Sequence, residues 1–201
     1  MTFPSTVFVP GTTITHEWLN GVNNAIVDGS ANINYTPPFT DSVTTTVGNK
    51  LAQTVSVADF GAVGDGVTDD TAAIQAALDA AKQVFLPTGN YMITSTVSIP
   101  SGGALVGEGF GSIITNNSAY RGVYTGGSSV LIANLRVVGS GSAAGHVDGR
   151  GAIHLENASK VVVNNVSVYG ARSTGISCGT CTDVEISNFI IDNTLEHGLY
   201  L

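Results

Sequence analysis

The sequence predicts an all-β protein whose strands wind into a parallel β-helix, a solenoid in which each coil stacks on the previous one. Three observations indicate this: low charge, short strand-like runs beyond residue 83, and a repeat in the last third of the chain. Of 201 residues, 11% are charged, 43% are hydrophobic and 25 are glycine. Such a chain is too apolar for a disordered protein and too poor in charge for a helical bundle. Its length suits one domain or two small ones.

The repeat is clearest in three aligned segments, 130–138, 161–169 and 184–192. Each segment places Val or Ile at alternating positions. Each also places an asparagine at the same point, and these residues are Asn134, Asn165 and Asn188. We expect the aliphatic side chains to stack on their own images in the next coil and the asparagines to form an amide ladder at a bend.

The spacing of the repeat fits a solenoid. Val161 and Val184 lie 23 residues apart, while Val130 and Val161 lie 31 apart, and we place the excess in the Gly-rich run 139–151. A second short strand recurs at 153–155, 176–178 and 199–201. Leucine-rich repeats share this period but carry Leu at fixed sites and a helix in each unit. This chain shows Val and Ile and no such helix.

The region before the repeats carries three weaker signals. Residues 16–27 have apolar side chains at helical spacing, with Thr15 as a plausible N-cap, and these side chains are Trp18, Leu19, Val22 and Ile26. Residues 28–41 contain Pro37-Pro38 and favour a linker. Val43, Val47 and Leu51 predict a short helix within 42–53, although three consecutive threonines favour a strand.

Residues 56–82 combine a strand, Gly-rich turns and a helix. We expect the helix over 69–81, capped by Thr68 or Asp69, with Ile74 and Leu78 on its apolar stripe. Short strands then follow at 84–86, 91–94, 97–99, 104–107 and 112–115. The helix is well placed to cap the first coil, because an unpaired sheet edge invites aggregation. At the other end, 199–201 falls within a repeat, so we expect the chain to continue or another chain to cover that edge.

Two segments carry a family resemblance. Residues 59–78, DFGAVGDGVTDDTAAIQAAL, and 84–93, VFLPTGNYMI, resemble the pectate-lyase-like superfamily of right-handed parallel β-helices. That form of the motif is typical of bacteriophage tailspikes and tail fibres, and also of polygalacturonases. Residues 9–29 and 35–62 look like the virion-anchoring start of phage tail proteins.

The resemblance implies a tailspike or tail fibre with residues 1–54 as virion-anchoring head and neck and residues 55–201 as the start of the β-helix. It implies a homotrimer that docks on a portal, adaptor or baseplate protein of the phage tail and meets host capsule or O-antigen polysaccharide. Three copies could bury the apolar stripe of 16–27 together. The expected location is the virion, after synthesis in the host cytoplasm.

The net charge and the N-terminal residues agree with the assignment to a virion protein. The net charge of −8 disfavours nucleic-acid binding. Residues 1–5 lack the basic and apolar regions of a secretory signal peptide. No apolar run reaches the length of a membrane span, so we expect no membrane insertion.

No catalytic residue can be carried over from the polygalacturonases, whose motifs are Asn-Thr-Asp, Asp-Asp, Gly-His-Gly and Arg-Ile-Lys. Here Leu195 follows Asn193-Thr194, and Glu196 precedes His197-Gly198. Asp192 and Glu196 form the best local carboxylate pair, but we favour a coil bend for the first and a solvated face for the second. The catalytic residues stay unknown within 1–201.

The remaining chemical candidates have simpler structural explanations. We attribute the acidic residues Asp65, Asp69 and Asp70 to turn and helix-start chemistry rather than catalysis. The insertion at 139–151 carries His146, Asp148 and Arg150, which could touch sugar or a neighbouring subunit, although we favour a flexible surface loop.

Two further candidates lie in the strands. His154 has no apparent acidic partner, and we expect an exposed structural histidine. The spacing of Cys178 and Cys181 suggests zinc or redox chemistry, but no second pair exists, so we expect core or turn cysteines. We expect no cofactor and no metal.

Three functions therefore remain in competition. The first is a phage tailspike or tail fibre that recognises host polysaccharide. The second is a polysaccharide depolymerase, hydrolase or lyase, with its active site downstream of residue 201. The third is a secreted pectin-degrading enzyme, which the missing secretion signal disfavours.

Overall fold

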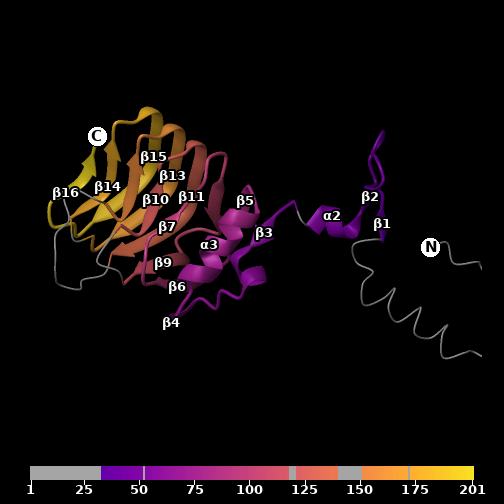
Figure 1. Cartoon of the computed structure of the whole chain (residues 1–201), viewed down its shortest axis with the longest axis horizontal. Helices are drawn as coiled ribbons and strands as arrows, with labels where there is room; N and C mark the ends of the chain where they lie inside the picture. The colour runs from indigo at the N-terminus through magenta and orange to yellow at the C-terminus, as the bar shows by residue number, and fades with distance from the viewer. Residues whose placement is uncertain (1–32, 52, 118–120, 140–150, 172) are drawn as a thin grey trace, which may run out of the picture. The chain divides into compact units, whose positions relative to one another are not determined.

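The fold is known from a computed structural model that describes residues 33–51, 53–117, 121–139, 151–171 and 173–201 (Figure 1). The chain divides into two units, Met1–Gln53 and Thr54–Leu201. The helix expected over 16–27 lies outside the described residues. Among the described residues, no helix has both the length and the apolar character that crossing a membrane requires.

The first unit contains a small hairpin and one helical turn. Strand β1 (Asn34–Tyr35) pairs antiparallel with β2 (Thr45–Thr46), and helix α2 (Val47–Leu51) follows at once. The Thr46 hydroxyl accepts a hydrogen bond from the N–H of Asn49, which caps the helix. The helix expected within 42–53 is therefore shorter than predicted, because the preceding threonines take the extended conformation that suits their branched side chains.

The second unit is a parallel β-helix built from two kinds of sheet. One has five parallel strands: β7 (Val97–Ser98), β10 (Val123–Thr125), β12 (Ile153–Glu156), β14 (Thr174–Gly179) and β16 (His197–Tyr200). The other is larger and bent, and its long strands are β11 (Ser128–Gly139), β13 (Ser159–Tyr169) and β15 (Thr182–Asp192).

The two halves of β11 continue separate stacks of shorter strands. Its first half follows β3 (Val55–Ser56), β5 (Gln83–Leu86) and β8 (Ala104–Gly107), and its second half follows β4 (Asp65–Asp69), β6 (Gly89–Ile93) and β9 (Ser112–Asn116). The five predicted short strands between 84 and 115 are thus confirmed, whereas β4 and β10 were not foreseen.

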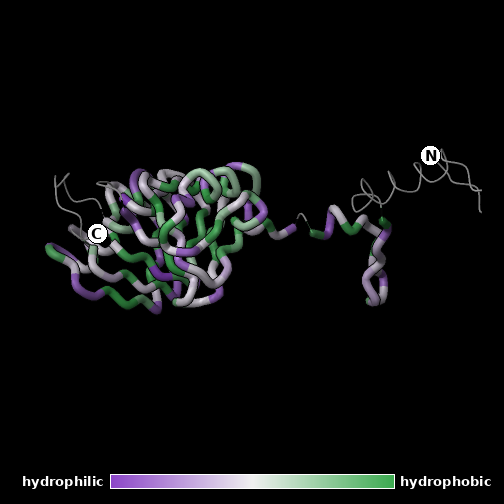
Figure 2. Tube along the Cα trace, turned by 90° about the horizontal axis from the view of Figure 1, so that it is seen from below, coloured by the Kyte–Doolittle hydropathy of each residue, from purple (hydrophilic) through white to green (hydrophobic). Residues whose placement is uncertain are grey.

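Aliphatic columns form the core, as the repeat predicted. Val130 pairs with Val161, and Val161 with Val184, so the three residues lie one above the other. Ile132, Val163 and Ile186 form the next inward column. Hydrophobic and hydrophilic residues alternate along the solenoid strands (Figure 2). Fully burying each such side chain contributes about 1.5–3 kcal/mol relative to an exposed one.

The asparagine ladder marks the bend between the two halves of the long strands. Asn134, Asn165 and Asn188 have positive φ values of 56°, 50° and 51°. Asparagine tolerates this left-handed conformation better than most residues. The Asn165 side-chain N–H donates to the Asn134 side-chain oxygen at 2.9 Å, which confirms the ladder between these two coils.

Other corners of the coils use the same backbone conformation, in two cases with less suitable residue types. Asn157 and Thr180 occupy equivalent positions in successive coils, with φ of 53° and 51°. Lys160 is also left-handed, at 53°. The geometry of a closed coil imposes these angles, and it overrides the preference of a β-branched residue for negative φ.

We predict that Thr180→Gly raises the free energy of unfolding by about 1 kcal/mol, since glycine removes the left-handed penalty of threonine but costs some chain entropy. Urea denaturation measures the change. Asn157→Gly, one coil earlier, is the matched control and should give a gain of only a few tenths. Equal gains at the two positions would show that side-chain branching is not the cause.

Helix α3 (Thr71–Ala80) covers the start of the core. It buries Ile74, Ala77 and Leu78 to 1% exposure or less. The predicted helix and its capping role are confirmed, but the predicted cap is wrong. Thr68 and Asp69 belong to β4, and Asp70 takes the N-cap position. The extended conformation persists to Asp69 because β4 pairs with β6 there.

A side chain of α3 forms hydrogen bonds along the unpaired edge of strand β7. The Gln75 amide N–H donates to the Ser98 carbonyl at 3.0 Å, and the Ser98 N–H donates to the Gln75 amide oxygen at 2.8 Å. Gln75 thereby replaces part of a missing neighbouring strand, which is one way to protect a sheet edge.

The last coil is more open. Four aliphatic residues that continue buried columns are only partly buried here, and they are Val184, Ile186, Ile191 and Leu199. Phe189 follows Leu135 and Val166 in its column, yet it is 40% exposed while they are fully buried. The core column therefore ends in contact with solvent at β15 and β16.

Candidate functional site

The outer face of the five-stranded sheet carries a column of residues that all have polar groups. The column follows the strands in order and consists of Ser98, Tyr124, His154, Ser177 and Tyr200. Their neighbours in the strands, such as Val123 and Ile153, point inward and are fully buried. The strand period of two therefore separates an aliphatic interior from this outward column.

A chain of hydrogen bonds runs through the middle of the column. The Gly151 N–H donates to the Ser177 Oγ at 2.9 Å. Ser177 Oγ lies 2.7 Å from His154 Nδ1, and His154 Nε2 lies 2.8 Å from a Glu156 carboxylate oxygen. Because a carboxylate only accepts, a neutral His154 carries its proton on Nε2 and accepts the Ser177 hydroxyl at Nδ1. The network thus orients Glu156.

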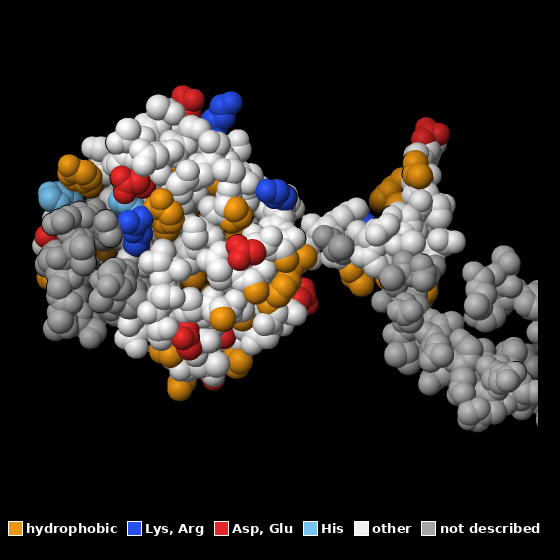
Figure 3. Space-filling model, viewed as in Figure 1, with side chains coloured by type: hydrophobic (Ala, Val, Ile, Leu, Met, Phe, Trp, Pro, Cys, Tyr) orange, Lys and Arg blue, Asp and Glu red, His pale blue; other side chains and the backbone are white. Residues whose placement is uncertain are grey.

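Aromatic and cationic groups flank this network. The rings of Tyr124 and His154 stack with centroids 6.0 Å apart and planes 21° apart. The Arg121 guanidinium carbon lies 4.4 Å from the centre of the Tyr124 ring, in cation–π range. The solenoid face seen in Figure 3 gathers acidic, basic and histidine side chains close together.

The geometry favours binding over nucleophilic catalysis. Ser177, His154 and Glu156 are connected like a serine-hydrolase triad, but Ser177 is 1% exposed and its Oγ already accepts from Gly151. A nucleophile must reach its substrate. The accessible end of the network is the Glu156 carboxylate, whose side chain is 39% exposed. This face can offer a planar ring, a cation and a fixed carboxylate to a polar ligand.

The expectation of an exposed His154 without an acidic partner was wrong. His154 is 5% exposed and is paired with Glu156. The signal was present in the sequence: two residues apart on a strand lie on the same face. A search for partners at that spacing finds Glu156, whereas the pairing with Ser177 depends on the stacking of coils.

The three acidic residues near α3 do have structural roles. The Asp65 carboxylate accepts from the N–H groups of Val67 and Thr68. The bond from the Thr68 backbone is the largest cause that lowers the pKa of Asp65, followed by that from Val67. The hydroxyls of Thr71 and Thr94 lower the pKa of Asp69 in the same way, because they donate to its ionised form.

Asp70 differs from its neighbours because it is 1% exposed. Its carboxylate oxygens accept from the backbone N–H groups of Val63 at 2.7 Å and Gly64 at 3.1 Å. Asp70 therefore fixes the preceding turn against the start of α3, which is a structural role.

Asp192 and Glu196 occupy the positions that we favoured. Asp192 ends β15 at a bend, where Asn193 has a φ of 54°. Glu196 is exposed and accepts a hydrogen bond from the Ser173 hydroxyl at 2.6 Å. The insertion residues His146, Asp148 and Arg150 lie outside the described residues.

The cysteines lie in the core and at a turn. Cys178 continues the inward column of Leu155 and is 9% exposed, while the Cys181 thiol donates to the Gly179 carbonyl. Both are free thiols. Within the described ranges, no cluster of three His, Cys, Asp or Glu residues is arranged to hold a metal ion.

Burial, with a smaller contribution from Cys181, raises the pKa of Cys178 to about 11. We predict that Cys178 reacts with a thiol reagent at pH 8 only when the protein unfolds. Since the unfolded thiol ionises near pH 9, the stability that this group contributes should fall as the pH rises from about 9 to 11. Mass mapping after timed alkylation checks the first point, and fast native labelling of Cys178 would contradict it.

The architecture and the polar outer column define a parallel β-helix protein with a candidate ligand-binding face. Residues 54–200 match the family described as rhamnogalacturonase A/epimerase, pectate lyase-like. The chain belongs to this family.

Similar proteins include phage and fungal ones. The pre-neck appendage protein of Bacillus phage B103 is 26% identical over 151 residues, covering 72% of this chain and 16% of the relative. Rhamnogalacturonase A of Aspergillus niger is 27% identical over 165 residues, covering 73% of this chain and 36% of the enzyme. The chain thus spans well under half the length of these relatives.

A similar solved structure is tailspike protein 3 of bacteriophage CBA120. It superposes with a TM-score of 0.58 at 14% identity, over 94% of this chain and 39% of the tailspike. This similarity supports the shared fold.

Proposed function

We propose that the chain belongs to a phage tail appendage of the tailspike or tail fibre type, which attaches to the virion through residues 1–54 and presents the β-helix to host surface polysaccharide. The phage relatives support the assignment to a tail protein. The single observation that supports ligand recognition is the outward group of Arg121, Tyr124, His154 and Glu156.

The chemistry of this group suits a saccharide. An aromatic ring packs against the C–H face of a sugar, while the fixed Glu156 carboxylate accepts hydrogen bonds from sugar hydroxyls. The Arg121 guanidinium, held over Tyr124 at 4.4 Å, can pair with the carboxylate of an acidic sugar.

Polysaccharide binding can be tested with an array of acidic and neutral bacterial surface polysaccharides and the whole chain. Tyr124→Ala should reduce binding at least tenfold, because the ring supports both Arg121 and His154. Tyr169→Ala is the matched control, since Tyr169 is 48% exposed at the end of a different sheet. Binding that depends on Tyr169 and not on Tyr124 would contradict the proposed site.

Virion attachment calls for a separate experiment. Negative-stain microscopy of purified phage with an antibody to residues 1–40 should label the tail. Label on the capsid alone, or on no particle, would exclude the tail assignment.

We also propose that the appendage is a homotrimer. No described residue of the first unit is buried, and Phe39, Val43 and Leu51 are 75%, 82% and 67% exposed. An isolated two-stranded hairpin is marginal in water, so contacts with other copies would supply its missing core. Analytical ultracentrifugation should find a trimer, and a monomer would contradict this.

The second candidate is a polysaccharide depolymerase whose active site lies in further coils. The family description favours it. Incubating the full-length protein with host capsule should then release new reducing ends or an unsaturated sugar that absorbs ultraviolet light. Neither product from a capsule that the protein binds would exclude it.

A further inference from the structure

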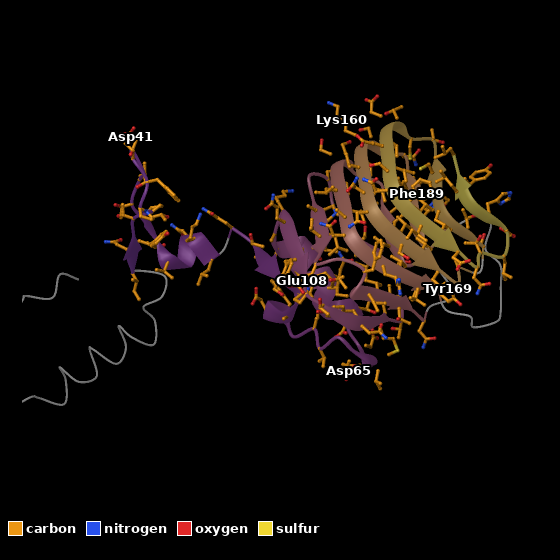
Figure 4. All side chains as sticks on the ribbon, turned by 180° about the vertical axis from the view of Figure 1, so that it is seen from behind. Asp41, Asp65, Glu108, Lys160, Tyr169 and Phe189 are labelled. Carbon is orange, nitrogen blue, oxygen red and sulfur yellow. The ribbon has the colours of Figure 1, made fainter. Side chains whose placement is uncertain are left out.

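The two cysteines of the chain lie three residues apart at one corner of the solenoid. Cys178 is near the end of β14, and Cys181 comes directly before β15. These strands belong to different sheets, so the chain turns between them. Thr180 makes the turn with a left-handed φ of 51°. Strand β15, which carries Phe189, then runs near the C-terminal end of the solenoid (Figure 4).

Both cysteine side chains occupy inward positions. Cys178 pairs with Leu155 of the preceding coil, and Leu155 is fully buried. Cys181 continues the position of Ala158, because the residues that follow these two are partners in the parallel register. Ala158 is 2% exposed, and Cys181 packs against the same core cluster. The two thiols therefore lie on the same side of the turn, towards the core.

The turn is tight enough for a disulfide bond. An extended Gly179 followed by a left-handed Thr180 is the order of conformations found in type II turns. The first and fourth Cα atoms of such a turn lie within about 7 Å of each other. Disulfide-linked Cα atoms lie about 4.4–6.8 Å apart, so the corner can accept the bond with little backbone movement.

We propose that Cys178 and Cys181 are a redox pair, which a small disulfide such as oxidised glutathione converts into a disulfide bond across the corner between β14 and β15. The partly exposed Cys181 reacts first. Its thiolate attacks one sulfur of glutathione disulfide, and the bond between the two glutathione sulfurs breaks. One glutathione thiolate leaves and takes up a proton, while Cys181 stays linked to the other glutathione.

The buried Cys178 then resolves this mixed disulfide. Its thiolate attacks the Cys181 sulfur, the bond to glutathione breaks, and the second glutathione thiolate takes up the proton that Cys178 lost. Two protein thiols are thus oxidised to one disulfide, and one glutathione disulfide is reduced to two thiols. Burial, followed by the neighbouring Cys181, raises the pKa of Cys178 to about 11, which keeps it inert towards reagents in bulk solvent. Attack within the turn is intramolecular and therefore has a high effective concentration.

The disulfide stabilises a corner of the last coils. Two backbone hydrogen bonds cross there, from the Thr182 N–H to the Ala158 carbonyl at 3.0 Å and from the Asn157 N–H to the Gly179 carbonyl at 2.9 Å. We expect oxidation to slow hydrogen exchange of these two amides by about threefold or more, because the linked corner opens less often.

The pair does not depend on the proposed function, but that function supplies both redox states. A phage tail protein is made in a reducing cytoplasm, where the thiols stay free, and it acts outside the cell, where disulfides persist.

Mass spectrometry of the whole chain tests the pair. The reduced, native protein is incubated in a glutathione buffer rich in the oxidised form, quenched with acid and mapped by proteolysis. The disulfide between Cys178 and Cys181 should exceed the reduced form by about tenfold or more. Cys178→Ser should stop at the mixed disulfide on Cys181, and Cys181→Ser should leave Cys178 reduced. Circular dichroism checks folding, and Cys178→Ala replaces Cys178→Ser if the serine variant unfolds.

The contrary outcomes are equally clear. A wild-type chain that keeps both thiols, or that stops at a mixed disulfide, would overturn the pair. A disulfide that joins two copies, or that forms only in urea, would also overturn it, because the native corner would then not bring the thiols together. Glutathione on Cys178 in Cys181→Ser would overturn the assigned order of the two steps. Each of these results leaves the assignment to a phage tail protein untouched.

Discussion

Replacing Asp70 with alanine is expected to lower the free energy of unfolding by about 3 kcal/mol. The carboxylate is 1% exposed and accepts two backbone hydrogen bonds, from Val63 and Gly64. Hydrogen bonds to a charged group contribute about 1.5–3 kcal/mol each, and alanine leaves both donors without this acceptor. The loss should loosen the turn that precedes α3 and, with it, the cap on the first coil. Urea denaturation measures the change.

Two controls define the role of Asp70. Asp70→Asn keeps one acceptor oxygen and should lose about half as much stability as alanine. Asp183→Asn changes an exposed carboxylate in β15 and should stay within about 0.5 kcal/mol of the wild type. Similar losses for Asp70→Ala and Asp183→Asn would show that general charge, and not the two local bonds, is responsible.

Truncating the central aliphatic column should give a gradient along the solenoid. Ile132 is fully buried between Leu105 and Val163, and Ile132→Ala is expected to cost about 4 kcal/mol. Ile186 belongs to the same column but is only partly buried in the last coil. Ile186→Ala should therefore cost about 1.5 kcal/mol, because less surface leaves water and the cavity opens to solvent.

The comparison between the two alanine variants uses the same chemical change in one column. Equilibrium denaturation of the 201-residue chain gives both values. Equal losses in the free energy of unfolding would mean that Ile186 is as deeply buried as Ile132. That result would contradict the partial burial of Ile186 in the last coil. In a longer protein with further coils, the cost at Ile186 should rise towards that at Ile132.

Much of the fold follows from local patterns in the sequence. The alternation of Val and Ile and the matched asparagines predicted which residues of β11, β13 and β15 pair. The Ile74 and Leu78 stripe predicted the helical cap. These features could be recognised because stacked coils repeat the same environment, so each residue has a counterpart one repeat away.

Other features depend on contacts that no local pattern records. The start of α3 was misplaced because β4 pairs with β6 as far as Asp69, and Asp70 then reaches back to Val63 and Gly64 instead of capping in the usual forward sense. The left-handed backbone at Lys160 and Thr180 contradicts the preference of those residue types, so only coil geometry reveals it.

The candidate site was predicted less well than the fold. His154 appeared to stand alone because its partners come from two sources. Glu156 lies two residues away on the same strand, but Ser177 is brought to it by the next coil. The stacking of Tyr124 on His154 likewise joins residues thirty positions apart in sequence, which periodicity alone does not select, whereas Arg121 lies only three residues from Tyr124.

The most direct test of the stacked parallel coils is a nuclear Overhauser measurement on deuterated, isotopically labelled protein. Backbone and methyl contacts should connect Val161 to both Val130 and Val184, with neighbouring residues following in the same direction along each strand. Contacts that run in opposite directions along β11 and β13, or that shift the register of these three valines, would contradict the parallel β-helix.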